Sequence, residues 1–152
     1  MKTLARPRDK AELLLRLKEV RPGSQGRWGR MSAHQMVCHL ADNYRMALGQ
    51  RAVPSGPLPL PRVLVKWGAL YAPIPWPKGI PTSPETDQER GGTRPVAFAA
   101  DLAQALALLE LLTTETGPLA LQPHPVFGRM SVADWLRWGY LHTDHHLRQF
   151  GA

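Results

Sequence analysis

The sequence predicts an all-α protein, an up-down four-helix bundle with a long Pro-rich connection that carries a short extra helix. Three observations lead to this prediction. Apolar residues recur at helical spacing in five segments, Pro and Gly gather between those segments, and no segment alternates apolar and polar residues as a strand does. Because helices without strands bury their apolar faces against one another, a bundle is the expected architecture. A length of 152 residues suits one domain, residues 1–152.

The first two helices are predicted from their periodicity and from the residues at their ends. Residues 9–20 stop before Pro22-Gly23 and repeat apolar residues at helical spacing: Leu13, Leu14, Leu17 and Val20. The second helix covers residues 33–49, between Ser32, a natural N-cap, and Gly49.

A Pro-rich part of the chain separates these two helices from the rest. It contains a short apolar helix at about 62–72, and residues 73–94 are too rich in Pro and Gly for regular structure. Two longer helices follow, at about 95–115 and about 132–149. The earlier of the two opens with Pro95, a favoured first-turn residue, and stops at Gly117-Pro118.

Composition and charge argue against several classes of protein. Cys38 is the only cysteine, which excludes an intramolecular disulfide and fits a reducing compartment. The N-terminus lacks the apolar run of a signal peptide, and no stretch reaches the roughly 18 to 20 apolar residues of a membrane span, so a cytoplasmic protein is expected. The net charge of +7 is spread from Lys2 to Arg148, which favours a solvated surface over a nucleic-acid-binding one.

Two similar five-residue segments precede the second and the last predicted helix, WGRMS at 28–32 and FGRMS at 127–131. In each, the serine is a natural N-cap, and Gln35 or Asp134 stands three residues later to complete a capping box, the Asp being the weaker variant. Similar helix starts are sufficient to explain the capping. The histidines of the two helices also lie at matching positions relative to these caps. Counted from the N-cap of their own helix, three of them fall on nearly the same helix face: His39, His142 and His146.

The histidines of the two helices separate by direction. His142 and His146 are four residues apart, just over one turn, so their Cβ atoms lie about 5–6 Å apart on one face. A helical wheel places this pair on the apolar arc and His145 on the opposite, solvent side. In the second helix it places His39 on the apolar side and His34 toward water.

Three inward histidines on facing helices indicate a metal site. A single buried histidine is usually a core residue with hydrogen-bonded nitrogens, whereas three need partners that one shared cation provides. Three histidines with a vacant fourth position are a catalytic zinc arrangement. His39, His142 and His146 are therefore the predicted ligands of one divalent ion, and neutral imidazoles suit zinc, nickel, copper and ferrous iron alike.

Three segments resemble motifs of the DinB/YfiT-like superfamily: MSAHQMVCHLADNYRMALG at 31–49, HPVFGRMSVADW at 124–135 and HTDHHLRQFG at 142–151. The resemblance covers nearly the whole chain and is closest to an uncharacterised branch with a C-terminal HxDHHxxQFG motif. It implies a four-helix bundle whose metal is held by one histidine of the second helix and an HxxxH pair of the last. These positions fall on His39, His142 and His146.

The resemblance also bears on activity. Characterised members of the superfamily include thiol-dependent S-transferases that use glutathione, mycothiol or bacillithiol, and a maleylpyruvate isomerase. Others are known as damage- or stress-inducible proteins. In such enzymes the metal is thought to activate the cofactor thiol, and a divalent cation does lower the pKa of a bound thiol or water.

Other residues near the histidines each have two interpretations. Asp42 either accepts a proton from a ligand imidazole or forms a surface salt bridge to Arg45. Asn43 and Gln149 either line a ligand pocket or satisfy backbone groups. Gly139, one turn before the histidine pair, either allows close helix approach or leaves room for a ligand.

Residues farther along the chain extend the candidate site. His124, in the loop before the last helix, either reaches the mouth of the site or stiffens the loop. Trp67, Trp76 and Tyr71 either wall a substrate cavity or, as most aromatic residues do, pack in the core. Cys38 points away from its histidine neighbour and is expected to be a small buried hydrophobe.

The leading hypothesis is a cytosolic metal-dependent enzyme, a thiol-dependent S-transferase or a hydrolase that acts on a small electrophilic molecule. A thiol or water would take the open coordination position of the metal. The alternative is a non-catalytic, stress-related protein that binds a metal or a small ligand through the same residues. A basic nucleic-acid-binding domain is disfavoured because the charges are dispersed, and a homodimer fits a bundle with spare apolar surface.

Overall fold

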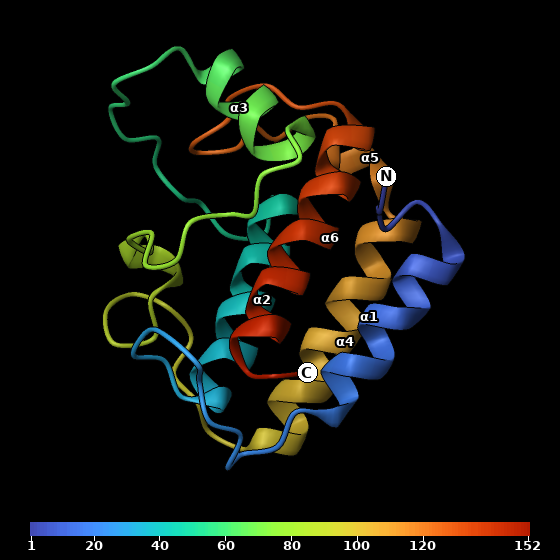
Figure 1. Cartoon of the computed structure of the whole chain (residues 1–152), viewed down its shortest axis with the longest axis vertical. Coiled ribbons are helices and arrows are strands. Elements are labelled where there is room, and N and C mark those ends of the chain that lie inside the picture. Colours follow the sequence, from blue (N-terminus) through green and yellow to red (C-terminus); the bar gives the residue numbers. More distant parts are fainter.

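The computed structural model describes all residues, 1–152, and contains helices and no strands (Figure 1). The only β-type pairing is an isolated antiparallel bridge between His124 and Gly128. The elements in chain order are α1 (Pro7–Glu19), α2 (Ala33–Ala47), α3 (Arg62–Tyr71), the 3-10 turn η1 (Pro84–Thr86), α4 (Phe98–Thr114), α5 (Thr116–Leu119) and α6 (Val132–Gln149). The predicted all-α helical-bundle fold is confirmed.

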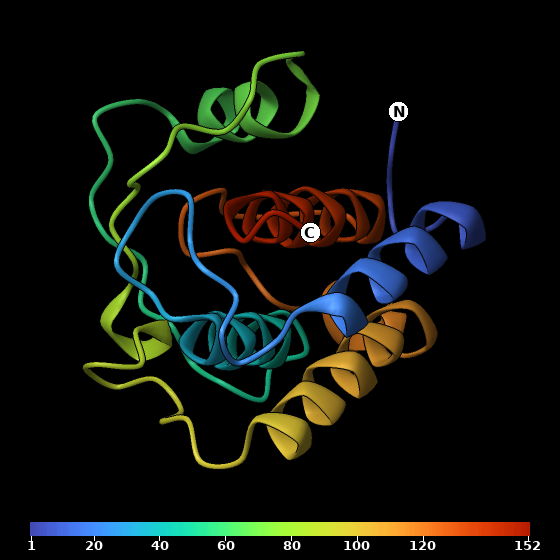
Figure 2. The same ribbon diagram turned by 60° about the horizontal axis from the view of Figure 1, so that its bottom comes forward.

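Four of the helices form the bundle. α2 packs chiefly against α4, and α1 packs against α6. α1 and α6 run in one direction and α2 and α4 in the other, because the long connection after α2 returns the chain to the end at which α2 began (Figure 1). α2 and α6 lie side by side in both ribbon views, so one face of this pair is turned away from α1 and α4 (Figure 2).

The core between the helices is apolar and continuous. The predicted apolar stripe of α1 is buried at Leu13 and Leu17, and α4 contributes Leu109 on the facing side. Tyr44 of α2 is fully buried, and its hydroxyl lies 2.7 Å from Thr143 Oγ1 of α6. This hydrogen bond joins α2 to α6 next to the inward histidines, because Thr143 directly follows His142 in the chain.

The echoed segments WGRMS and FGRMS produce the same structure twice. Ser32 and Ser131 are the N-caps of α2 and α6, and each forms a complete capping box with the residue three positions later. Gly29 and Gly128 both adopt positive φ, 77° and 69°, a conformation that L residues with a Cβ rarely take. Both predicted caps are confirmed, so the two helices that carry the inward histidines begin in the same way.

The ends of α4 differ from the prediction. The helix begins at Phe98, because Ala97 is extended and the Asp101 carboxylate accepts hydrogen bonds from the N–H groups of Val96 and Ala97. Pro95 lies before the helix, outside regular structure. It ends at Thr114, and the Gly117-Pro118 pair expected to terminate it lies inside the short helix α5. Residues 73–94 also contain one regular turn, η1.

The Pro-rich connection covers the outer face of α2 and α6. In Figure 2 the segments around residues 50–60 and 73–94 arch over this face, opposite α1 and α4. α3 packs against α6, where the hydroxyl of Tyr71 donates a hydrogen bond to Asp134 and Lys66 Nζ lies 3.2 Å from the same carboxylate. None of the helices combines the length and the apolar character that a membrane span requires.

Candidate metal centre

Three histidine side chains meet between α2 and α6. His39 comes from the middle of α2, and His142 and His146 come from successive turns of α6. All three are buried, and one donor nitrogen from each lies within 4.8 Å of the others. Imidazole nitrogens bound at about 2.0–2.1 Å to one tetrahedral ion lie about 3.4 Å apart. His39 Nε2 and His142 Nε2 lie 3.4 Å apart.

Hydrogen bonds fix the tautomers of two of these rings. His39 Nδ1 lies 2.8 Å from the carbonyl oxygen of Thr86, which only accepts, so the imidazole carries its proton on Nδ1. His146 Nδ1 lies 2.8 Å from Gln149 Oε1, and the orientation of this amide follows because Gln149 Nε2 donates to the carbonyl oxygen of Trp28. Both rings therefore present an unprotonated Nε2.

The third ring completes the arrangement. His142 Nε2 faces His39 Nε2 at 3.4 Å, and the ring of His142 stacks on Trp138 with an interplanar angle of 13°. Its Nδ1 is buried and has no hydrogen-bond partner. Facing imidazole nitrogens need a proton or a cation between them, so the donor set fits a divalent metal ion.

Burial keeps these imidazoles neutral. Desolvation lowers the pKa of His39, although the Thr86 carbonyl and the charge of Asp42 partly oppose the shift. Desolvation, reinforced by the neighbouring histidines, lowers the pKa of His142 and of His146 well below the usual value. A neutral imidazole is the form that binds metal, so no proton has to leave these rings near neutral pH.

The three histidines stand in the wall of a cavity of about 930 Å³. Five of the six histidines of the chain border it. Much of the remaining wall is apolar and aromatic, and it includes Trp28, Trp76, Phe127 and Trp138. A space of this size holds an organic molecule in addition to a metal ion.

Three other predicted site residues also border the cavity. Asn43 Nδ2 lies 3.2 Å from His39 Nε2 and donates to the His39 carbonyl oxygen at 2.8 Å, so it serves both the backbone and the site. Gln149 likewise bonds a backbone carbonyl and a histidine ring. His124 is buried in the wall, with its ring stacked on Phe127.

Asp42 forms the predicted ion pair with Arg45, but in the interior and not at the surface, and it does not accept a proton from an imidazole. It is fully buried, and no hydrogen bond joins it to a histidine ring. Its carboxylate instead pairs with Arg45 and Arg51 and accepts hydrogen bonds from Gln88 and Thr93. The carbonyl of Thr86 takes the place expected for Asp42, because the long connection folds over α2 and delivers a backbone oxygen there.

The structure decides between the two interpretations given for Gly139 and for Trp76, and it contradicts both for Trp67. Gly139 does not border the cavity: a Cβ there would lie 2.7 Å from Leu4 Cδ1, so this glycine allows the N-terminal segment to approach α6. Trp76 walls the cavity, and its Nε1 donates to the Ala69 carbonyl oxygen. Trp67 does neither of the things expected, because its side chain is 64% exposed.

The two histidines predicted to face water are both half-buried. His145 borders the cavity with its ring edge-on to Trp28 and near Trp76, because the loops cover the arc of α6 that a helical wheel leaves open. His34 Nε2 lies 2.7 Å from the Asp101 carboxylate, beside the start of α4. The prediction that these rings point to solvent is wrong because it considered each helix alone.

Cys38 is buried, as predicted for a small hydrophobe. It forms a second cluster of potential metal ligands with His34 and Asp101 on the α4 side of α2. Burial, followed by the nearby Asp101 and Asp42 charges, raises the pKa of the Cys38 thiol to about 12. The Asp101 carboxylate is already occupied in capping α4, so this cluster is explained by the helix start.

Some residues of the site were not predicted from sequence. Trp138 is four residues before His142 on the same face of α6, so its spacing carried a signal that it adjoins the histidine. Thr86 and Trp28 contribute backbone carbonyls, and any residue has a carbonyl, so neither carried a signal. Gln88, in the cavity wall, likewise lies in a segment without periodicity.

The structure is a helical bundle in which three buried histidines that could hold a metal ion lie beside a large cavity. The sequence profile of the DinB superfamily matches residues 4–150, which is nearly the whole chain. The chain therefore belongs to the DinB superfamily. No curated protein and no solved structure matches it in the corresponding searches.

Proposed function

We propose that this protein is a divalent-metal-dependent enzyme, a thiol-dependent S-transferase or a hydrolase that acts on a small electrophilic molecule. The observation that carries the proposal is the convergence of imidazole nitrogens from His39, His142 and His146 in the wall of a cavity. Structural metal sites are enclosed by protein ligands, whereas catalytic sites keep one position open toward a substrate. Three protein ligands next to about 930 Å³ of space support the catalytic kind.

The residues of the chain prepare the site before any ion binds. Thr86 and Gln149 hold two of the rings in the tautomer that exposes Nε2, and Trp138 restrains the third by stacking. A divalent ion held there would lower the pKa of a bound thiol or water and so supply a nucleophile near neutral pH. The apolar walls would exclude bulk water and orient the carbon skeleton of the electrophile.

Zinc and nickel are the proposed ions, and iron and copper have the same imidazole preference. A low-molecular-weight thiol such as glutathione, mycothiol or bacillithiol is the proposed co-substrate of the transferase form, as in characterised members of the superfamily. The cavity is large enough for such a thiol and a small electrophile together.

A second candidate function is non-catalytic binding of a metal or small ligand under stress. The half-buried His145 favours it, since this ring also borders the cavity and offers a fourth imidazole near the first three. A fourth protein ligand would close the coordination sphere. The two candidates therefore differ in whether the open position belongs to a substrate.

Metal analysis of untagged protein tests the site. Wild-type protein grown in metal-replete medium should carry about one divalent ion per chain, and His39→Ala and His142→Ala should lose it. His145→Ala is the matched control, because it removes a neighbouring cavity histidine and should retain the ion. Metal-free wild type, or equal loss in the control, contradicts the proposed ligand set.

Turnover assays separate the two functions. The metal-loaded enzyme should conjugate a thiol to 1-chloro-2,4-dinitrobenzene or hydrolyse 4-nitrophenyl acetate, and His142→Ala should abolish either activity. A full metal complement without turnover across a panel of thiols and electrophiles, combined with metal loss in His145→Ala, would favour the binding protein.

A further inference from the structure

The loop before α6 holds a histidine, His124, that is not one of the three proposed metal ligands. His124 and Gly128 exchange backbone hydrogen bonds, each 2.8 Å long, which close a tight loop over residues 124–128. Inside this loop His124 Nδ1 accepts hydrogen bonds from the N–H groups of Val126 at 3.1 Å and Phe127 at 3.2 Å. Two donors aimed at Nδ1 leave no room for a proton there, so the neutral ring carries its proton on Nε2.

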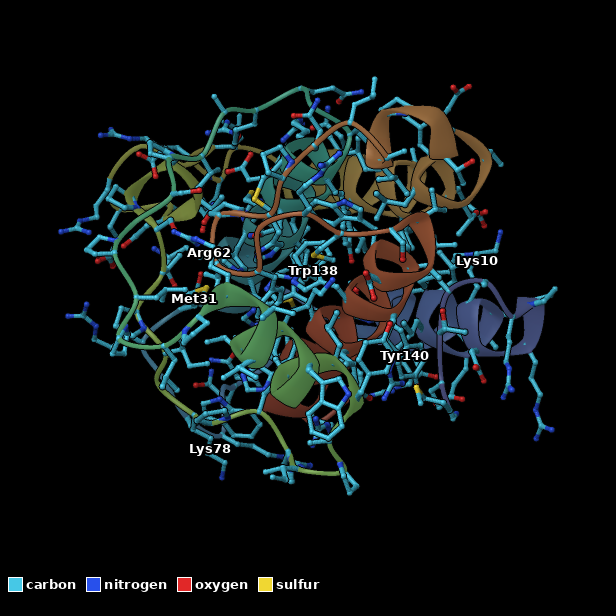
Figure 3. The ribbon with its side chains drawn as sticks, turned by 90° about the horizontal axis from the view of Figure 1, so that it is seen from above. Lys10, Met31, Arg62, Lys78, Trp138 and Tyr140 are labelled. Atoms are coloured by element: carbon cyan, nitrogen blue, oxygen red, sulfur yellow. The ribbon has the colours of Figure 1, made fainter.

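The ring of His124 cannot turn. It stacks on Phe127 with an interplanar angle of 18° and a centroid distance of 4.4 Å. Trp135 lies tilted to it and Trp138 packs edge-to-face with it, each with a centroid distance of 5.3 Å. Arg62 braces the same loop from outside by donating to the carbonyl oxygens of Pro125 and Val126 (Figure 3). The direction of the Nε2–H bond is therefore set by the protein.

This N–H group has no partner in the protein. His124 is 6% exposed and borders the cavity, yet Nε2 takes part in no hydrogen bond and is not among the fully enclosed unpaired atoms. Because Nε2 is not fully enclosed, its N–H group can donate to an acceptor that enters the cavity, and a ligand oxygen there would gain a hydrogen bond of fixed direction. Burial and the charge of Arg62 keep the ring neutral, with a pKa of about 3.

The His124 N–H donor lies one aromatic ring away from the three clustered histidines. Trp138 packs edge-to-face with His124, with ring centroids 5.3 Å apart, and stacks on His142, with centroids 5.0 Å apart. One indole therefore separates the N–H donor from the three histidines. A ligand that reaches both must carry an oxygen acceptor at one end, an apolar body of about one aromatic ring, and its reacting group at the other end.

We infer that the cavity binds an apolar, ring-sized organic molecule through a carbonyl or carboxylate oxygen, which accepts a hydrogen bond from His124 Nε2. This inference deepens the proposed function by naming the class of electrophile, and it rests on that function only for the reaction at the metal. His124 acts here as a substrate-binding residue of fixed direction. Aromatic walls at Trp28, Trp76 and Phe127 suit the ring of such a ligand.

Calorimetric titration of chelator-treated, metal-free protein tests the inference with three probes. Benzoate carries a carboxylate, acetophenone a neutral carbonyl, and ethylbenzene no acceptor. His124→Asn is the informative variant, because its Oδ1 replaces Nδ1 as acceptor for the loop N–H groups and nothing replaces Nε2–H. The variant should weaken binding of the oxygen-bearing probes about fivefold to tenfold and that of ethylbenzene by less than twofold.

The control variant and the remaining outcomes make the test decisive. His145→Asn alters another cavity histidine and should leave the oxygen preference unchanged. Unchanged binding of both oxygen probes in His124→Asn, or equal weakening of all three, would overturn the inference; the tighter-binding oxygen probe identifies the acceptor group. The titrations use metal-free protein, so their outcome does not depend on the metal. A wild-type protein that carries no metal after growth would contradict the proposed function and leave this result intact.

Discussion

At the residue scale, the geometry of the site depends on the groups that orient the histidine rings by hydrogen bonds as much as on the histidines themselves. Gln149 is the clearest example, since one amide group bonds the His146 ring at its oxygen and the Trp28 carbonyl at its nitrogen. A Cβ on Gly29 would lie 2.7 Å from that nitrogen, so glycine at this position keeps room for the amide. Hydrogen-bonded partners of this kind raise the basicity of a metal-ligating imidazole and hold its orientation.

Replacing Gln149 should therefore weaken metal binding without removing a ligand. We expect Gln149→Leu to lower zinc affinity about tenfold to a hundredfold in competition with a chromophoric chelator. Gln149→Glu retains an acceptor oxygen and should stay closer to wild type. Equal affinities for Leu and wild type would show that His146 needs no such support.

The neutral ring of His124 predicts a pH dependence of stability. Burial, reinforced by Arg62, lowers its pKa from 6.5 to about 3. Between these values the unfolded chain binds a proton that the folded protein does not, so the free energy of unfolding falls as the pH falls through this window. Above the unfolded pKa neither state is protonated and the effect vanishes.

His124→Asn removes this titration and keeps the loop acceptor. Between pH 7 and pH 5 the metal-free variant should lose about 2 kcal/mol less unfolding free energy than metal-free wild type. Urea denaturation at each pH measures the difference. Parallel loss in both proteins would mean that His124 is protonated within the folded state.

At the scale of elements, the two capping boxes set the start of the helices that carry the three clustered histidines. The Ser32 and Ser131 hydroxyls each accept from the backbone N–H three residues later, at 3.1 Å. Each capping box follows a glycine with positive φ, Gly29 before Ser32 and Gly128 before Ser131. The equivalent registers of His39 and the α6 pair thus follow from equivalent helix starts.

Removal of either cap should destabilise the protein by a similar amount. Ser32→Ala and Ser131→Ala should each lower the free energy of unfolding by about 1 kcal/mol. Chemical denaturation gives the measurement, and Ser55→Ala, an exposed serine in the connection, is the matched control. A cap variant that behaves like the control would contradict the contribution of that box.

At the scale of the whole molecule, Asp42 joins the bundle to the connection that covers it. Its buried carboxylate binds Arg45 on its own helix, and Arg51, Gln88 and the backbone of Thr93 from the connection. The same connection supplies the Thr86 carbonyl that fixes His39. Asp42 therefore supports the three-histidine cluster through the placement of a segment and not through contact with an imidazole.

Asp42→Ala should loosen this segment. Loss of a buried carboxylate leaves two guanidinium groups without their partner, and we expect the free energy of unfolding to fall by about 3 kcal/mol. Hydrogen exchange should accelerate at residues 84–93 more than in α1. Uniform exchange along the chain would indicate a purely global effect.

The sequence alone determined the helices, their caps and the face on which each inward histidine lies. These properties follow from local rules, since apolar spacing sets a helix face and a serine followed by Gln or Asp sets its start. They were sufficient to place His39, His142 and His146 on facing stripes. Even the mistaken direction of His145 came from a correct helix considered without its surroundings.

Only the tertiary structure decided what surrounds those histidines. Thr86 reaches His39 across 47 residues, Gln149 is oriented by Trp28 across 121, and Leu4 rather than a ligand meets Gly139. Such contacts involve loops without periodicity and backbone carbonyls that every residue possesses. The physical reason is that local spacing encodes the direction of a side chain along its own helix, whereas the path of the connection depends on packing of the whole chain.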